Sequence, residues 1–391
     1  MKFTLFHLMP YLHLDPNYSD TYKSAWTILP NTHYDPKKGA ALYNRFLGEL
    51  EYGETLGYDH VAVNEHHQNA YGIMPSPIVT AAALARRTKR VKIAILGSAI
   101  PLREHPLTIA EEHAMIGNIT EGRLISGFVR GIGAEYHTFG VSPAQSHERF
   151  HEAHDLIIEA WTRPGPFPFE GKHYHFQYVN LWPRPYQTPH PPVWIPSQGS
   201  QETIEWAAHP KRKYAYLQTF SPAKAVQFHL QMYRDVAAKY GYEAHLDQVG
   251  WMIPLYVGET DESARREAKP HFEYFRNKLL RMPLEMLLPP GYLSLASHGR
   301  VMAAKGQMGG EITMEQADEA GMIVVGSAET VRQKLEHYHK TVGFNQLLCL
   351  HQFGTEPEDL TRANMERFAR HVMPKLRPLG EDKPLARAAA E

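Results

Sequence analysis

Short β-rich runs alternate with segments of helical periodicity from one end of the chain to the other, and this alternation is the strongest constraint on its fold. Runs such as residues 93–96 (IAIL) and 125–129 (ISGFV) are apolar on both faces, as expected for strands that are covered on both sides. Eight βα units in series predict an α/β protein with a (β/α)8 TIM barrel. The eight candidate strands are residues 2–8, 60–64, 91–97, 123–129, 192–196, 214–219, 251–257 and 346–350.

Serines mark several expected helix starts between these strands. Ser76, Ser200 and Ser327 each precede a helical pattern, and a serine hydroxyl can accept the free backbone N–H groups of a first turn. Glu202 and Glu329 then fall in first turns, where a carboxylate suits the positive end of the helix dipole.

Three segments are too long for plain barrel loops. We expect residues 1–378 to form one barrel domain with insertions near 9–36, 163–190 and 282–320, and residues 379–391 to form a flexible tail. The third insertion is rich in Leu, Met and Pro, so exposure to water would be unfavourable. It is therefore predicted to be a lid packed over a pocket.

The charge balance and the single cysteine exclude several classes of partner. Lys and Arg total 41 against 42 Asp and Glu, which leaves no basic excess for a phosphate backbone, so nucleic acid is not an expected partner. Cys349 alone cannot form a disulfide or a cysteine-based zinc site within one chain. No run approaches the roughly 18 apolar residues of a membrane span, and the first residues do not resemble a secretory signal. These features predict a cytoplasmic protein without membrane contact.

Chemistry in a barrel belongs at the carboxyl ends of its strands. The second predicted strand ends in Glu65, His66 and His67. A histidine there can exchange protons near neutral pH, and a neighbouring carboxylate can fix its tautomer. The chain carries 24 His, so an adjacent pair at a strand end is also compatible with chance.

An anion site is predicted at the ends of the fourth and fifth strands. Arg130 follows the fourth strand among glycines that allow a ligand to approach the backbone, and its planar guanidinium can donate two parallel hydrogen bonds to a phosphate. Gly199, Ser200 and Thr203 open the helix after the fifth strand. Ordinary helix capping would require the same residues, but the two strand ends are neighbours on the barrel rim, so one phosphate could contact both.

A competing motif lies in residues 147–151, which match HExxH. On a helix this pattern places two imidazoles on one face for zinc, with the glutamate as general base. No third ligand follows at a recognisable spacing, and the helix is expected in the outer ring. Its stripe of Phe150, Ile157 and Trp161 should face the barrel and leave the histidines, including His154, largely in solvent. We therefore expect no metal at this position.

Six short motifs occur in the order found in one known family. They are residues 65–67 (EHH), 102–106 (LREHP), 121–124 (EGRL) leading to 129–131 (VRG), 199–200 (GS), 205–208 (EWAA) and 325–331 (VGSAETV). With the barrel pattern, the chain resembles the bacterial luciferase-like flavin-dependent monooxygenases over nearly its whole length. This resemblance implies a (β/α)8 barrel that binds reduced FMN with its phosphate at the rim of strands four and five.

The resemblance also assigns residues. It implies that Arg130, Ser200 and Thr203 hold the phosphate, with Gly199 as a further cofactor-binding residue. It also implies that His66 is the catalytic histidine, with Glu65 and Tyr136 among its helpers. The flavin ring is implied to rest against a cis non-proline peptide near the end of the third strand. In this sequence the corresponding residues are Gly97, Ser98 and Ala99. Gly97 and Ser98 are therefore candidate cofactor-binding residues.

The implied reaction is oxygenation of a small, apolar or aromatic organic substrate by O2 and FMNH2 through a C4a-peroxyflavin. A separate NAD(P)H flavin reductase is implied as partner, since no GxGxxG unit is visible, and relatives commonly form homo-oligomers. Luciferase itself has a cysteine at Val129 and an acidic residue at Gly199, which argues against light emission here. The alternatives are a deazaflavin-dependent hydride-transfer enzyme on the same fold, an HExxH zinc hydrolase and a nonenzymatic flavin-binding protein.

Overall fold

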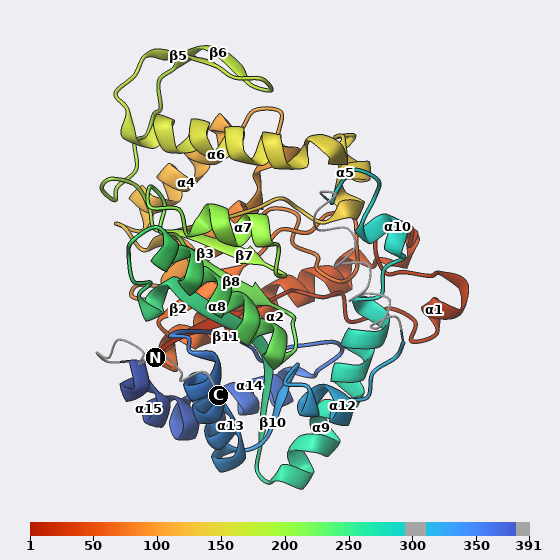
Figure 1. Cartoon of the computed structure of the whole chain (residues 1–391). Helices are drawn as coiled ribbons and strands as arrows, with labels where there is room; N and C mark the ends of the chain where they lie inside the picture. The colour runs from red at the N-terminus through yellow and green to blue at the C-terminus, as the bar shows by residue number, and fades with distance from the viewer. Residues whose placement is uncertain (294–309, 381–391) are drawn as a thin grey trace.

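A closed barrel of parallel strands forms the centre of the molecule (Figure 1). The computed structural model describes residues 1–293 and 310–380. Pairing of β9 with both β8 and β11 closes the ring, so the eight-stranded barrel predicted from the sequence is confirmed. The barrel strands are β1 (Lys2–Phe6), β2 (His60–Val63), β3 (Lys92–Ala99), β4 (Leu124–Val129), β7 (Val193–Ser197), β8 (Ala215–Thr219), β9 (Val249–Gly258) and β11 (Gln346–Leu350).

A further strand that the sequence did not predict, β10 (Val324–Ser327), pairs in parallel with the second half of β9. The first half of β9 pairs with β8 on one side and β11 on the other. β9 is therefore long because its first residues pair within the barrel and its last residues pair with β10.

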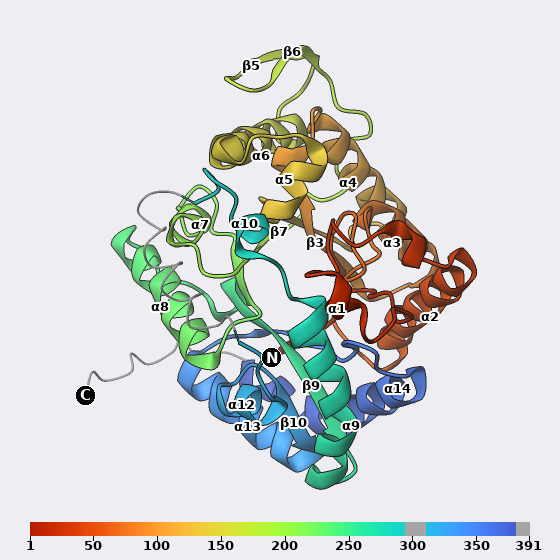
Figure 2. The ribbon, with the colours of Figure 1, turned by 90° about the vertical axis from the view of Figure 1, so that its right-hand side faces the viewer.

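Helices surround the strands on all sides in the turned view (Figure 2). Ser76, Ser200 and Ser327 are confirmed as N-caps, because each hydroxyl accepts a backbone N–H of the first turn. The α-helices are α1 (Tyr18–Thr21), α2 (Pro36–Thr55), α3 (Pro77–Arg87), α4 (Leu107–Ile119), α5 (Gly133–Phe139), α6 (Ser146–Thr162), α7 (Gln201–Ala207), α8 (Ala223–Lys239), α9 (Asp261–Tyr274), α10 (Leu284–Leu287), α12 (Met314–Glu319), α13 (Ala328–Val342), α14 (Glu358–Arg367) and α15 (Met373–Leu376). Within the described residues, no helix is long and apolar enough to cross a bilayer.

Aromatic side chains fill the layer between the barrel and the outer helices. Phe128 on β4 is fully buried and stacks near Trp161 of α6, with ring centroids 6.0 Å apart. Trp251 on β9 is also fully buried, against Tyr338 and Phe344. Burial of each large apolar side chain contributes about 1.5–3 kcal/mol, so this layer fixes the strands and hence the loops at their carboxyl ends.

The first two insertions have different structures. Residues 9–36 pack onto the barrel, where the Trp26 indole donates to the Leu279 carbonyl at 2.9 Å. The second insertion contains a two-stranded antiparallel hairpin, β5 (Phe167–Glu170) and β6 (His175–Val179), which projects from the body at the top of Figure 1.

Residues 286–289 of the third insertion pack against α5. A Cβ at Gly133 would lie within 2.6 Å of backbone or proline atoms of Met286, Leu287 and Pro289, so these two segments are in close contact. Residues 294–309 of the predicted lid lie outside the described residues, as does the predicted tail from 381 onward. Leu379 and Gly380, assigned to that tail, belong instead to a 3-10 helix (Arg377–Gly380).

Candidate active site

The two adjacent histidines after β2 belong to separate networks. His67 Nε2 lies 2.8 Å from Glu65 Oε1, and Arg103 donates to the same oxygen at 2.9 Å. Glu65 Oε2 accepts the backbone N–H of Ala99 at 3.3 Å. The Glu65 side chain is fully buried, so its charge is compensated by these donors and ties the end of β2 to the end of β3.

His66 contacts another carboxylate, which the sequence did not assign. Its Nδ1 lies 3.2 Å from Oε1 of Glu135, in the first turn of α5. The imidazole also packs edge-on against Trp26 and Tyr71, at centroid distances of 5.1 and 5.2 Å. In the sequence, Glu135 is recognisable only as an acidic residue at a helix start after the fourth strand. Its partner His66 lies 69 residues away in the chain, so the contact could not be read from local sequence.

Tyr136 takes a different place from the proton-transfer role predicted for it. Its hydroxyl donates to the backbone carbonyl of Arg130, and its ring packs among Ala99, Leu102 and Tyr292. Burial raises the pKa of Tyr136. The structure therefore places this phenol as a support for the Arg130 backbone.

Arg130 has no carboxylate partner among the residues that the structure describes. Its guanidinium donates to the Ser146 hydroxyl at 3.0 Å and to the Tyr292 carbonyl at 3.1 Å. The Tyr292 ring covers it, with the guanidinium carbon 4.4 Å from the ring centroid. An arginine held by neutral partners keeps its charge available for an anion.

Gly199, Ser200 and Thr203 form the turn that opens α7. Ser200 Oγ accepts the N–H of Thr203 at 3.4 Å and donates to Glu202 at 2.9 Å. Gly199 has a φ of +99°, and a Cβ there would lie 2.1 Å from the His229 ring. Only glycine fits this position, because the backbone is left-handed and the imidazole fills the adjacent space.

The predicted proximity of Arg130 to this turn has support in strand pairing and in electrostatics. β4 pairs directly with β7, so the two strand ends are neighbours. The pKa of His147 is lowered to about 4, chiefly by burial; the charge of Arg130 acts in the same direction, and the charge of Glu202 opposes it. His147 therefore lies near enough to both Arg130 and Glu202 for their charges to affect it. Sequence reasoning did not assign His147 to this site, because it considered the residue only as part of HExxH.

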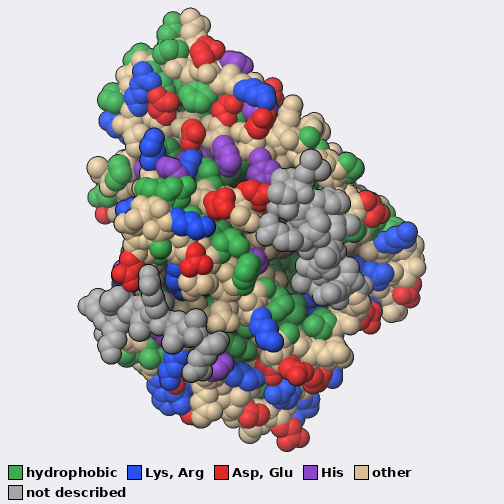
Figure 3. Space-filling model, viewed as in Figure 1, with side chains coloured by type: hydrophobic (Ala, Val, Ile, Leu, Met, Phe, Trp, Pro, Cys, Tyr) green, Lys and Arg blue, Asp and Glu red, His purple; other side chains and the backbone are tan. Residues whose placement is uncertain are grey.

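The side chains of the HExxH pattern point to different neighbours. Glu148 binds Lys172 and His173 of the hairpin loop, whereas the His151 ring stacks on Trp206 at a centroid distance of 5.5 Å. His154 is buried against Tyr214, so the prediction that it faces solvent was wrong. Among residues 1–293 and 310–380, no group of three or more His, Cys, Asp or Glu side chains is arranged to hold a metal ion. Figure 3 shows histidines at the surface in the region of α6 and α7.

The end of β3 has the backbone feature that the resemblance implies. The peptide bond between Leu96 and Gly97 is cis, and a Cβ at Gly97 would lie 2.7 Å from the Gly127 backbone. The Ser98 hydroxyl points away from the barrel opening and bonds His113 of α4 at 3.1 Å. Gly97 and Ser98 were both predicted to contact the cofactor. Because the Ser98 hydroxyl bonds His113, only the backbone of Ser98 is left for such a contact.

Buried polar atoms without partners occur where a polar cofactor would need them. Asn64 Oδ1, Arg103 Nε and Gln352 Oε1 have no hydrogen-bond partner within the described part of the chain. Asn64 follows β2 and Gln352 follows β11, so both stand at the carboxyl end of the barrel. Unpaired buried polar groups are costly. A ligand with donors for the two amide oxygens and an acceptor for Arg103 Nε would satisfy them.

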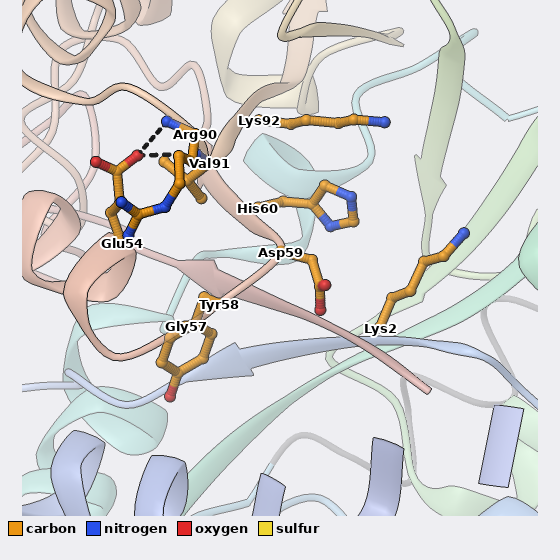
Figure 4. A pocket seen from close by; sticks show the side chains of 9 residues that line it. All are labelled: Lys2, Glu54, Gly57, Tyr58, Asp59, His60, Arg90, Val91 and Lys92. Atoms are coloured by element: carbon orange, nitrogen blue, oxygen red, sulfur yellow. Dashed lines mark hydrogen bonds between the residues drawn. The ribbon is translucent and has the colours of Figure 1, made fainter. Parts of the chain in front are cut away.

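Two hollows differ in their position on the barrel. One of about 630 Å³, lined by Arg103, Phe139 and Arg149, lies at the carboxyl end of β3. The other, of about 410 Å³, lies where the strands begin (Figure 4). There Glu54 accepts the N–H groups of Arg90 and Val91 at 2.6 and 2.8 Å, which joins α2 to the start of β3. We therefore regard the second hollow as structural.

The chain is similar in sequence to known monooxygenases. The chain is 24% identical to the alkanal monooxygenase alpha chain of Photobacterium leiognathi, covering 85% of this chain and 93% of the relative. It is 29% identical over 164 residues to the oxygenase component of the flavin-dependent trigonelline monooxygenase of Acinetobacter baylyi, covering 41% of this chain and 45% of that protein.

Solved structures share the fold over almost the entire chain. Monooxygenase RslO1 of Streptomyces bottropensis has a TM-score of 0.72 at 25% identity, covering 96% of this chain and 99% of that one. The oxygenating constituent of 3,6-diketocamphane monooxygenase of Pseudomonas putida, solved with FMN, has a TM-score of 0.71 at 18% identity, with the same coverage. Because the model of the luciferase-like monooxygenase family matches residues 24–344, the chain belongs to this family of oxidoreductases.

Proposed function

We propose that the protein is the oxygenase of an FMN-dependent monooxygenase, which uses reduced FMN and O2 to oxygenate a small apolar or aromatic substrate. One observation carries the proposal. The link from β4 to α5 supplies both Arg130, an arginine without a described carboxylate partner, and Glu135, which contacts His66. A candidate anion contact and a candidate proton-transfer group thus stand at the same end of the barrel.

The residues present fit the flavin. Arg130, Ser200 and Thr203 would bind its phosphate, with His147 beside them. The phosphate would displace the Glu202 carboxylate from the Ser200 hydroxyl, since both compete for that donor. Gly97 and the backbone of Ser98 would border the ring, and the unpaired amide oxygens of Asn64 and Gln352 would accept hydrogen bonds from its polar edge; these two side chains were not predicted. Bound reduced flavin supplies the electrons that activate dioxygen.

The protein side of the reaction consists of proton handling and exclusion of water. His66 would hold or transfer a proton at Nε2, which has no hydrogen-bond partner in the described ranges 1–293 and 310–380. Trp26 and Tyr71, stacked with centroids 4.7 Å apart, form an apolar border beside it. Residues 284–292 cover Arg130 and α5. Such a cover suits a site where water would divert activated oxygen to peroxide.

A separate reductase follows from the same proposal. The relative from Acinetobacter baylyi is named as an oxygenase component, and the barrel shown here has no Gly-rich nucleotide loop of the GxGxxG type. We infer that an NAD(P)H flavin reductase delivers reduced FMN, that the chain works as a homo-oligomer and that it does so in the cytoplasm. Cys349 is fully buried, which suits a thiol that stays reduced.

Anaerobic titration tests the cofactor assignment. Reduced FMN should bind, and Arg130→Met should weaken its affinity roughly tenfold to a hundredfold, because a hydrogen bond to a charged group is worth about 1.5–3 kcal/mol. Arg163→Met, an exposed arginine over Phe167, is the matched control and should bind normally. Tighter binding of a reduced deazaflavin than of reduced FMN, or unchanged affinity in the Arg130 variant, would contradict the proposal.

A further inference from the structure

The contact between His66 and Glu135 joins two largely buried side chains. Their side chains are 14% and 2% exposed, and His66 Nδ1 lies 3.2 Å from Glu135 Oε1. Hydrogen-bond partners decide which imidazole nitrogen carries the proton in a neutral histidine. The identity of the atom opposite Nδ1 therefore determines what Nε2 can do.

Glu135 is oriented by a second, independent hydrogen bond. Its Oε2 accepts the backbone N–H of Ile132 at 2.8 Å, just before α5 begins. One oxygen is thus committed to the helix start, and the other is directed at His66. Because a carboxylate only accepts, the bond to His66 requires a proton on Nδ1.

The other nearby carboxylate is not available for this task. Glu65 has both oxygens occupied by His67, Arg103 and the backbone of Ala99. The sequence placed Glu65 as the partner of the catalytic imidazole, but the structure gives it to His67. Glu135 is the carboxylate within hydrogen-bond distance of His66.

We propose that Glu135 is a positioning residue for His66, which keeps the proton on Nδ1 and leaves the Nε2 lone pair facing the barrel opening. This inference rests on the proposed function, in which His66 exchanges a proton at Nε2. It adds a requirement to that function, namely that His66 accepts a proton there first and donates it afterwards. In this arrangement Glu135 acts through His66, with its other oxygen bonded to the Ile132 N–H.

The tautomer can be measured without any cofactor. In protein labelled with 15N at histidine, the ring signals of His66 are those that disappear in His66→Gln, and their shifts identify the protonated nitrogen. The wild-type protein should show Nδ1–H. In Glu135→Gln the amide oxygen can retain the Ile132 N–H, so the NH2 group faces Nδ1 and the proton should move to Nε2.

Control variants separate this effect from a general change in the protein. Glu148→Gln removes a carboxylate that bonds His173 at 3.2 Å on the exposed side of α6, and it should leave the His66 signals unchanged. Glu135→Asp keeps the charge and should retain Nδ1–H in part of the population. With reduced FMN and oxygen, Glu135→Gln should release peroxide roughly tenfold faster, a fraction of the about 10²–10⁴-fold that a positioned proton-transfer group contributes.

The outcomes distinguish this inference from the proposed function. Nε2–H in the wild-type protein, or an unchanged tautomer in Glu135→Gln, overturns the positioning role whatever the activity. A changed tautomer with unchanged peroxide release also overturns it if His66→Ala does alter release. If neither variant alters release, the proposed use of His66 fails, while the assignment of the tautomer to Glu135 stands.

Discussion

The His229 ring occupies the space that a side chain at position 199 would need. The imidazole of His229, on α8, lies against the Cα of Gly199, and its buried Nδ1 has no hydrogen-bond partner in the described part of the chain. The left-handed backbone of Gly199 adds a second reason for glycine. The turn before Ser200 is therefore shaped by a helix that is distant in sequence.

Replacement of this glycine should reveal both effects. Gly199→Ala should lower the free energy of unfolding by about 2–5 kcal/mol, as the sum of left-handed strain and overpacking against the ring. Gly241→Ala is the matched control, because Gly241 has a φ of +78° and open space around its Cα. It should cost only about 1–2 kcal/mol.

A double variant completes the test. Gly199→Ala with His229→Ala should recover most of the overpacking cost in urea unfolding, since the ring that opposes the new Cβ is gone. Equal costs for the alanines at 199 and 241 would show that His229 yields without penalty.

Sequence reasoning identified residues whose role depends on local position and missed those that depend on distant partners. Glu65, His66 and Arg130 were found because they directly follow strands. Glu135 and His147 were not assigned, since nothing near them in the sequence indicates what they face. Tyr136 was named as a helper of His66, and its hydroxyl bonds the Arg130 carbonyl.

Among the elements, α6 holds the turn of the hairpin β5–β6 through a carboxylate that accepts three backbone N–H groups. Glu152 on α6 accepts the backbone N–H groups of Lys172, His173 and Tyr174 at 2.9, 2.9 and 2.7 Å. This arrangement attaches the turn of the hairpin to the helix. The hairpin itself is only two strands wide, and such units are marginally stable alone.

Loss of this carboxylate should release the hairpin without unfolding the barrel. Glu152→Ala should increase protease cleavage between residues 163 and 190 roughly tenfold, because three backbone N–H groups lose their acceptor. Glu159→Ala, which removes an exposed pair with Arg163 on the same helix, should not do so. Mass spectrometry of a limited digest identifies the cleavage sites, and cleavage distributed over the barrel instead would contradict this assignment.

The elements themselves were predicted to differing degrees. All eight barrel strands follow from apolar runs, but β10 has only four residues and was not predicted. The stripe of Phe150, Ile157 and Trp161 on α6 is buried as expected. Periodicity could not show that Trp206 of α7 packs against Phe150, His151 and His154 of this helix.

Across the whole molecule, burial keeps many histidines neutral. Desolvation lowers the pKa of His60, His147, His151 and His351 to about 4 and that of His113 to about 3. The unfolded chain would take up these protons near pH 6.5, while the folded protein would not do so until about pH 4 or below.

Stability should therefore fall as the pH drops from about 6.5 to about 4. Each fully buried histidine contributes up to about 1.4 kcal/mol per pH unit in this window. His113→Gln should reduce the slope, since glutamine can still bond Ser98 and Ser126 but takes up no proton. The exposed His137→Gln should leave the slope unchanged. Urea unfolding across this pH range checks both, and equal slopes for the His113 variant and wild type would refute the account.

The short link between β4 and α5 has a consequence for how the chain can vary. A helix advances by about 100° per residue, so one residue added between Arg130 and Glu135 would swing the Glu135 carboxylate to another side of α5. A change in the length of the projecting hairpin would not rotate α5 in this way. The count of residues in this link, by contrast, is as much a part of the chemistry as their identity.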